Sequence, residues 1–127
     1  MSINEKVGYW FKSAKRDRKS AISMFDSGHY DWSLFIWHLV LEKIVKAKIA
    51  KLGKKVLWTH NLTLLCEKAE IKLNEAEFAE LSEIKTFNIE ARYDNYKFDF
   101  YKKATKYYTE KWIQICEQFY KKVKKDL

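Results

Sequence analysis

The sequence predicts an all-α protein, a compact up-and-down bundle of about five helices formed by a single domain over residues 1–127. Proline is absent and glycine occurs only three times, so few residues interrupt a helix. Apolar side chains also recur at the 3.6-residue spacing of amphipathic helices. With 47% hydrophobic and 33% charged residues, the composition is that of a folded globular domain rather than a disordered chain.

A first helix is expected to begin near Ile3, because Ser2 and Glu5 have the spacing of a capping box. Gly28 is expected to end this region of the chain in the left-handed conformation. The apolar positions that follow the helical period are Val7, Trp10, Phe11, Ala14, Ala21, Ile22 and Phe25.

A second helix is expected from about Trp32 to Leu52, with Asp31 as its N-cap and Gly53 at its end. The first half of this helix is apolar nearly all round. Such a pattern indicates a central helix that other elements cover on several sides.

A loop over residues 53–58 separates this helix from a short third one, which we expect over residues 60–69 with Thr59 as its N-cap. Asn74 and Glu77 then have the spacing that opens a fourth helix. Its expected inward face carries Phe78, Leu81 and Ile84.

Residues 88–96 fit either a broken helix or a turn, and a long fifth helix is expected from about Lys97 to the basic end of the chain. Aromatic residues alternate with lysines in this last segment, a mixture that suits stacking on single-stranded nucleic acid. At helical spacing, such a stripe more often packs in a core or at a dimer interface, and we favour that interpretation. The apolar stripe comprises Phe100, Ala104, Tyr107, Tyr108, Trp112, Ile115, Phe119 and Val123.

The net charge of +8 is unevenly distributed. Residues 1–55 carry 12 basic and 5 acidic side chains, residues 67–90 carry 3 and 7, and residues 97–127 carry 9 and 4. An acidic segment therefore lies between two basic ones. This asymmetry permits contact with nucleic acid or with an acidic partner, although a lysine-rich surface is also common in ordinary globular proteins.

The two cysteines, Cys66 and Cys116, are not spaced as metal ligands, and no two histidines are three or four residues apart. We therefore expect no metal and no cofactor. The first ten residues lack the apolar core of a signal peptide, and no apolar run has membrane-spanning length. A reduced, cytoplasmic protein that does not contact a membrane is the expectation.

His38, Glu42 and Lys46 are spaced four apart in the second helix, so they share one stripe of its surface. The charges of Lys46 and Lys48 suit a side of this helix that faces solvent. His38 and Glu42 are surrounded by apolar residues, and a buried Glu42 needs a basic partner. Arg92 and Lys43 are the candidates for that partner.

Three motifs make the chain resemble the HEPN domains, small helical domains found beside minimal nucleotidyltransferases in prokaryotes. The first is Glu-Lys-x-x-Lys-Ala followed by a glycine, the second is Thr-His-x-Leu-x-x-Leu, and the third is the Glu-Ala-Arg-Tyr-Asp segment from Glu90 to Asp94. The residues of the first two are Glu42, Lys43, Lys46, Ala47, Gly53, Thr59, His60, Leu62 and Leu65. Two positions depart from the family pattern: Asn61 stands where aspartate is frequent, and Asp94 where proline follows the tyrosine.

The resemblance implies a helical bundle that is commonly a homodimer and that binds nucleotides as the companion of a separate nucleotidyltransferase. Some branches of the family are instead RNases of toxin–antitoxin and defence systems. Those branches carry an Arg-x4–6-His motif, in which His is the acid or base and Arg stabilises phosphate charge. No histidine follows Arg92 in this chain, and Arg16 and Arg18 are too far from His29, so the motif is missing.

The candidate ligand site therefore comprises Glu42, Lys43, Lys46, His60, Arg92 and Tyr93, with no catalytic residue among them. His60, expected at a helix N-terminus, and the two cationic residue types would bind a phosphate, and Tyr93 would stack on a base. The structural alternative is that His60 only packs and that Arg92 only pairs with Glu42. Asp17 is expected to form an internal ion pair with Lys43 or Arg18.

The preferred hypothesis is a non-enzymatic HEPN-type module that binds a nucleotide or the phosphate of RNA, or that helps a nucleotidyltransferase recognise its substrate. One alternative is an RNase with a non-standard residue set, such as His60 with Arg92. Another is an antitoxin-like scaffold that binds a protein partner through its helix faces.

Overall fold

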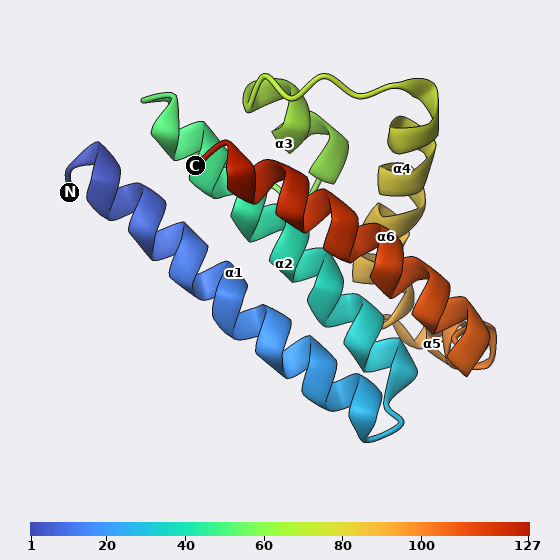
Figure 1. Cartoon of the computed structure of the whole chain (residues 1–127). Helices are drawn as coiled ribbons and strands as arrows, with labels where there is room; N and C mark the ends of the chain where they lie inside the picture. The colour runs from blue at the N-terminus through green and yellow to red at the C-terminus, as the bar shows by residue number, and fades with distance from the viewer.

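The computed structural model describes every residue from Met1 to Leu127 and contains six helices and no strand. The all-α prediction is confirmed, with one helix more than expected. The helices, drawn in Figure 1, are α1 (Ile3–Asp26), α2 (Tyr30–Lys51), α3 (Leu62–Lys68), α4 (Glu75–Glu90), α5 (Asp94–Lys103) and α6 (Lys106–Lys125).

Helix α2 is the centre of the bundle. It packs against all five other helices, and twelve of its residues are buried. The antiparallel helix α1 and the C-terminal α6 both run along it, whereas α3, α4 and α5 cover its remaining sides (Figure 1). The nearly uniform apolar character of its first half is explained by this position. Both chain termini lie at the same end of the bundle, near the C-terminal end of α2 (Figure 1).

Local sequence signals account for most helix ends. The Ser2 hydroxyl accepts from the Glu5 N–H at 3.1 Å while the Glu5 carboxylate accepts from the Ser2 N–H, which completes the predicted capping box. Asn74 and Glu77 form the same arrangement at the start of α4. Gly28 has a φ of 82°, as expected for a residue that follows a helix in the left-handed conformation.

Two predicted caps are wrong. Helix α2 begins at Tyr30, with His29 at the N-cap. Asp31 therefore lies in the first turn, where its negative charge interacts favourably with the positive end of the helix dipole. Helix α3 is capped by Asn61, whose side chain accepts from the Leu64 N–H, whereas the Thr59 hydroxyl accepts from the Asn61 N–H instead. Both errors misplace the N-cap by two residues, which is within the usual uncertainty of a helix boundary.

The predicted long fifth helix is divided in two at Ala104 and Thr105. The Thr105 hydroxyl accepts from the Tyr108 N–H at 3.2 Å and so caps α6, and Ala104 has a non-helical ψ of 60°. The ambiguous segment 88–96 becomes the last turn of α4, a turn at residues 91–93 and the start of α5. Most residues of the expected stripe are buried or half-buried, whereas Tyr107 at the start of α6 is 81% exposed.

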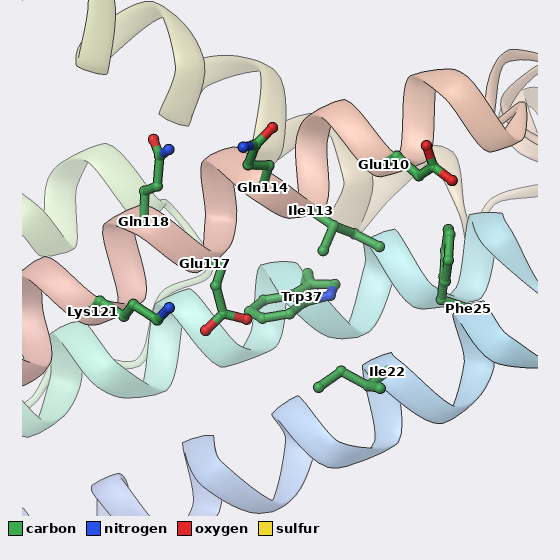
Figure 2. A pocket seen from close by; sticks show the side chains of 9 residues that line it. All are labelled: Ile22, Phe25, Trp37, Glu110, Ile113, Gln114, Glu117, Gln118 and Lys121. Carbon is green, nitrogen blue, oxygen red and sulfur yellow. The ribbon is translucent and has the colours of Figure 1, made fainter.

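A cavity of about 470 Å³ lies between α1 and α6, with the buried Trp37 of α2 beneath it (Figure 2). Ile22 and Phe25 of α1 form one wall, and the polar side chains of α6 form the other (Figure 2). None of the six helices combines the length with the apolar character that a membrane-spanning segment requires.

Candidate functional site

Glu42 lies in the middle of α2 and faces inward, with a side chain that is only 2% exposed. Burial raises the pKa of this carboxyl, because desolvation disfavours its charged form. The hydrogen bond and charge of His60, followed by the charges of Lys46 and Lys43, act in the opposite direction. The expected basic partner of the buried acid is therefore present, and it is a histidine.

His60 reaches Glu42 from the loop between α2 and α3. Its Nδ1 lies 2.9 Å from Oε1 and 3.3 Å from Oε2 of the carboxylate, while the ring as a whole is 62% exposed. When Glu42 is ionised, Nδ1–H of His60 donates to it, and the lone pair of Nε2 is left on the far side of the ring. A buried carboxylate thus orients an exposed imidazole, as the third group does in a catalytic triad.

His60 itself lies outside helix α3. The N-cap position belongs to Asn61, whose own side chain satisfies a free N–H group of the first turn. His60 therefore lies one residue before the N-cap, next to the N-terminus of this helix but outside the helix itself.

His38 belongs to the same cluster, although sequence reasoning left it out of the candidate site. It is fully buried one turn before Glu42, and its Nε2 lies 3.4 Å from Oε2 of that residue without forming a hydrogen bond. The pKa of His38 is lowered to about 4, mainly because burial disfavours the charged ring; the backbone of His60 acts in the opposite direction, and the nearby charges of His60, Arg92 and Lys46 act in the same direction as burial. His38 is therefore neutral at pH 7. Its spacing of four from Glu42, among apolar neighbours, was the signal that could have found it.

Arg92 does not pair with Glu42, so the expected ion pair between them is wrong. Its Nε donates instead to the carbonyl of Asn88 at 2.9 Å, in the last turn of α4. The guanidinium carbon lies 5.6 Å from the ring centroids of both Phe35 and Tyr93. A carbonyl at a helix C-terminus attracts a cation, and Glu42 already has His60 as its partner. The charge of Arg92 still reaches the cluster, because it lowers the pKa of His38.

The two lysines of the candidate site have different surroundings. The ammonium of Lys43 lies 2.6 Å from Asp17 of α1, which confirms the expected internal ion pair. The ammonium of Lys46 lies 5.2 Å from the ring centroid of Trp10 and has no acidic partner. Lys46 and Arg92 are thus the two cations near the cluster that form no ion pair.

Aromatic rings and cations continue from this cluster toward α5. The ring of Phe35 lies 6.4 Å from His38 and 5.9 Å from Trp32, and the ammonium of Lys97 lies 5.7 Å from the Trp32 ring. Tyr93, at the N-cap of α5, is 55% exposed. The site therefore combines an oriented imidazole, two cations that form no ion pair and exposed aromatic faces, which is chemistry suited to an aromatic anion.

The comparisons with known proteins agree with the motifs. The family model described as HEPN domain matches residues 7–126. No curated protein and no solved structure matches the chain. Because the family model covers nearly the whole bundle, from α1 to the last turn of α6, the chain belongs to the HEPN domain family.

Proposed function

We propose that this chain is a non-enzymatic HEPN-type module that binds the phosphate of a nucleotide or of RNA at the exposed edge of His60. The observation that carries the proposal is the bond between the buried Glu42 carboxylate and Nδ1 of His60, which leaves Nε2 directed away from the core. In the protonated imidazole, Nε2–H donates to a phosphate oxygen, and the positive charge of the ring is balanced by Glu42.

Two further cations support an anion at this position. Arg92 keeps its terminal N–H groups free of carboxylates, so they are available for a bidentate contact with phosphate. Lys46 adds a point charge from α2. Tyr93 offers an exposed ring beside Arg92. Lys43 plays no direct part in this proposal, because Asp17 already neutralises it.

The test is a titration of the isotope-labelled protein with inorganic phosphate and with AMP, followed by amide chemical shifts. We expect shifts around His60, Arg92 and Lys46 that weaken as salt is added, because charges exposed to solvent are screened. His60→Ala should abolish them. His29→Ala is the matched control, since His29 is exposed and its side chain makes no capping bond. Equal binding by the His60 and His29 variants, or no shift near His60, contradicts the proposal.

We expect a homodimer that acts as the substrate-binding companion of a separate minimal nucleotidyltransferase. Light scattering coupled to size-exclusion chromatography tests the dimer. A complex with the product of a neighbouring nucleotidyltransferase gene tests the association. A heteromeric complex that survives high salt and needs no nucleotide would instead favour the antitoxin-like scaffold.

RNA cleavage is a second candidate, because an imidazole held by a buried carboxylate is also the arrangement of a general base. In that case Nε2 of His60 removes the proton from a ribose 2′-hydroxyl, and Arg92 stabilises the charge on the phosphate. Labelled RNA should then be cut by the wild type and not by His60→Ala. Equal cleavage by the two proteins, or none by either, rejects this candidate.

A further inference from the structure

The loop between α2 and α3 is fastened on both sides of Trp58. Before it, Nζ of Lys54 donates to the carbonyl of Lys68 at 3.1 Å and lies 3.3 Å from the Glu70 carboxylate. After it, His60 is bonded to Glu42. The apolar side chains of Val56 and Leu57 also pack against the core. The backbone that carries Trp58 is therefore held in place from both directions.

Trp58 itself contacts almost nothing. Its side chain is 99% exposed, more than any other large hydrophobic side chain of the chain. An indole has a large apolar surface, and most tryptophans in folded proteins cover that surface at least in part. Both faces of this ring are open for stacking, and neither the bundle nor the candidate site described above uses them.

The position of Trp58 relates it to the phosphate site. Trp58 and His60 are both exposed, whereas Thr59 between them is half-buried. Trp58 and His60 therefore both present their side chains to solvent, two residues apart on one fastened loop. A ligand that fills both positions carries an aromatic ring and an anionic group a short distance apart, which describes a nucleotide better than free phosphate.

We propose that Trp58 stacks on the base of a nucleotide whose phosphate binds at His60, so that the ligand of the site is a nucleoside phosphate. This inference rests on the proposed function, and it assigns the base to Trp58 in place of Tyr93, the ring that the sequence led us to expect there. Stacking of a base on an aromatic side chain is tolerant of base identity, and the wider ring system of a purine gains the most contact. Ordering this loop on binding costs little conformational entropy, because the residues on both sides of Trp58 are already held in place.

The experiment compares AMP with ribose 5-phosphate, which carries the same sugar and phosphate without the base. The dissociation constants of both ligands are measured by calorimetry for wild type, Trp58→Ala and Trp58→Phe. Tyr107→Ala is the control for loss of an exposed aromatic ring, since Tyr107 is 81% exposed at the start of α6. Circular dichroism checks that each variant is folded.

We expect the wild type to bind AMP roughly tenfold or more tightly than ribose 5-phosphate, as base stacking on an aromatic side chain implies. Trp58→Ala should bind the two ligands equally, Trp58→Phe should keep most of the preference, and Tyr107→Ala should keep all of it. AMP should also quench the indole emission of the wild type more than that of Trp58→Ala.

Equal affinity of the wild type for the two ligands, or an AMP affinity that Trp58→Ala leaves unchanged, overturns the inference while phosphate binding at His60 stands. If neither ligand nor inorganic phosphate shifts the amides near His60, the proposed function fails first. If AMP leaves the indole emission unchanged and vesicles of anionic phospholipid shift it to the blue, Trp58 is a membrane contact and the inference is wrong.

Discussion

Arg18 of α1 and Glu117 of α6 join two helices that otherwise meet mainly through α2. Nε and Nη2 of Arg18 both lie 2.9 Å from Oε1 of Glu117, and Nε is also 3.1 Å from Oε2. The guanidinium carbon lies 5.6 Å from the ring centroid of Tyr120. This contact borders the cavity between α1 and α6 (Figure 2), because Glu117 is one of its lining residues.

Arg18→Lys should lower the free energy of unfolding by roughly 0.5–1 kcal/mol, because an ammonium cannot reproduce the forked contact and the stacking on Tyr120. Both partners are partly exposed, which limits the effect. Arg16→Lys is the matched control, since the Arg16 side chain is exposed and forms no ion pair. Urea denaturation of the three proteins measures the difference, and equal losses in the two variants would show that the fork contributes nothing.

His60→Ala should destabilise the bundle by about 2–3 kcal/mol, because it leaves the buried carboxylate of Glu42 without its hydrogen-bond donor. Replacing both residues, as Glu42→Leu with His60→Ala, removes the unpaired charge and should recover part of that loss. Denaturation of both single variants and the double variant completes the cycle. A double variant less stable than His60→Ala contradicts this account of the pair.

The buried His38 should make the protein sensitive to acid. Its pKa is about 4 in the folded chain against a usual 6.5, so below pH 6.5 the unfolded chain binds the proton more readily than the folded one does. The contribution of this group to stability is therefore lost as the pH falls from 6.5 to 4. Glu42, whose pKa is raised by burial, acts in the opposite direction, because its folded form loses stability as the pH rises above 4.5.

His38→Leu separates the two effects, since it removes the first group and keeps the second. Both ring nitrogens of His38 lack a hydrogen-bond partner, so an apolar side chain of similar size should cost little at pH 7. Between pH 7 and pH 4 the wild type should lose about 3 kcal/mol more than the variant does. Parallel stability curves for the two proteins over this range would refute the assignment to His38.

Thr105→Ala should cost about 1 kcal/mol, because it removes the side chain that accepts from the Tyr108 N–H at the start of α6. Thr105→Ser keeps an equivalent hydroxyl and serves as the control. Hydrogen exchange of the Tyr108 amide, together with urea denaturation, provides the measurement. Unchanged exchange in Thr105→Ala would mean that the cap does not hold this helix end.

The two thiols should be inert while the protein is folded. Both Cys66 and Cys116 are fully buried, and burial raises the pKa of Cys66 to about 12 and that of Cys116 as well. A thiol-specific chromogenic disulfide should therefore react only as the chain unfolds, with both cysteines released together. Rapid reaction of one thiol in the native protein would show that its helix opens locally.

Signals confined to a few neighbouring residues were predicted well. The capping boxes at Ser2 and Asn74 and the left-handed glycines at 28 and 53 depend on backbone groups within one turn of each residue. The division at Thr105 was missed because an uninterrupted helical period continues through it. A threonine at this position can either continue a helix or cap the next one. In this chain Thr105 caps α6, and Phe100 and Ala104, which precede it, are buried in the core.

Of the candidate site, the sequence predicted the position of the buried acid correctly but not its partner. The inward position of Glu42 followed from the apolar residues around it on α2, and this is a property of one helix. The partner of Glu42, in contrast, depends on which distant side chain the tertiary fold brings near. We expected Arg92, but His60 forms the hydrogen bond with Glu42 and Arg92 donates to the carbonyl of Asn88. Trp58 gave no periodic signal at all, because its exposure depends on how the flanking loop residues are fastened.

The proximity of the two chain ends has a practical consequence for rearranging this protein. Leu127 and Val7 line one small cavity, and Figure 1 shows both chain ends at the same end of the bundle. A short flexible peptide would span them, so a circular permutant that joins the old ends and opens the chain at the exposed turn around Gly28 should keep the same helix packing. In such a permutant, α2 would begin the chain and α1 would end it, with His60 still resting against Glu42.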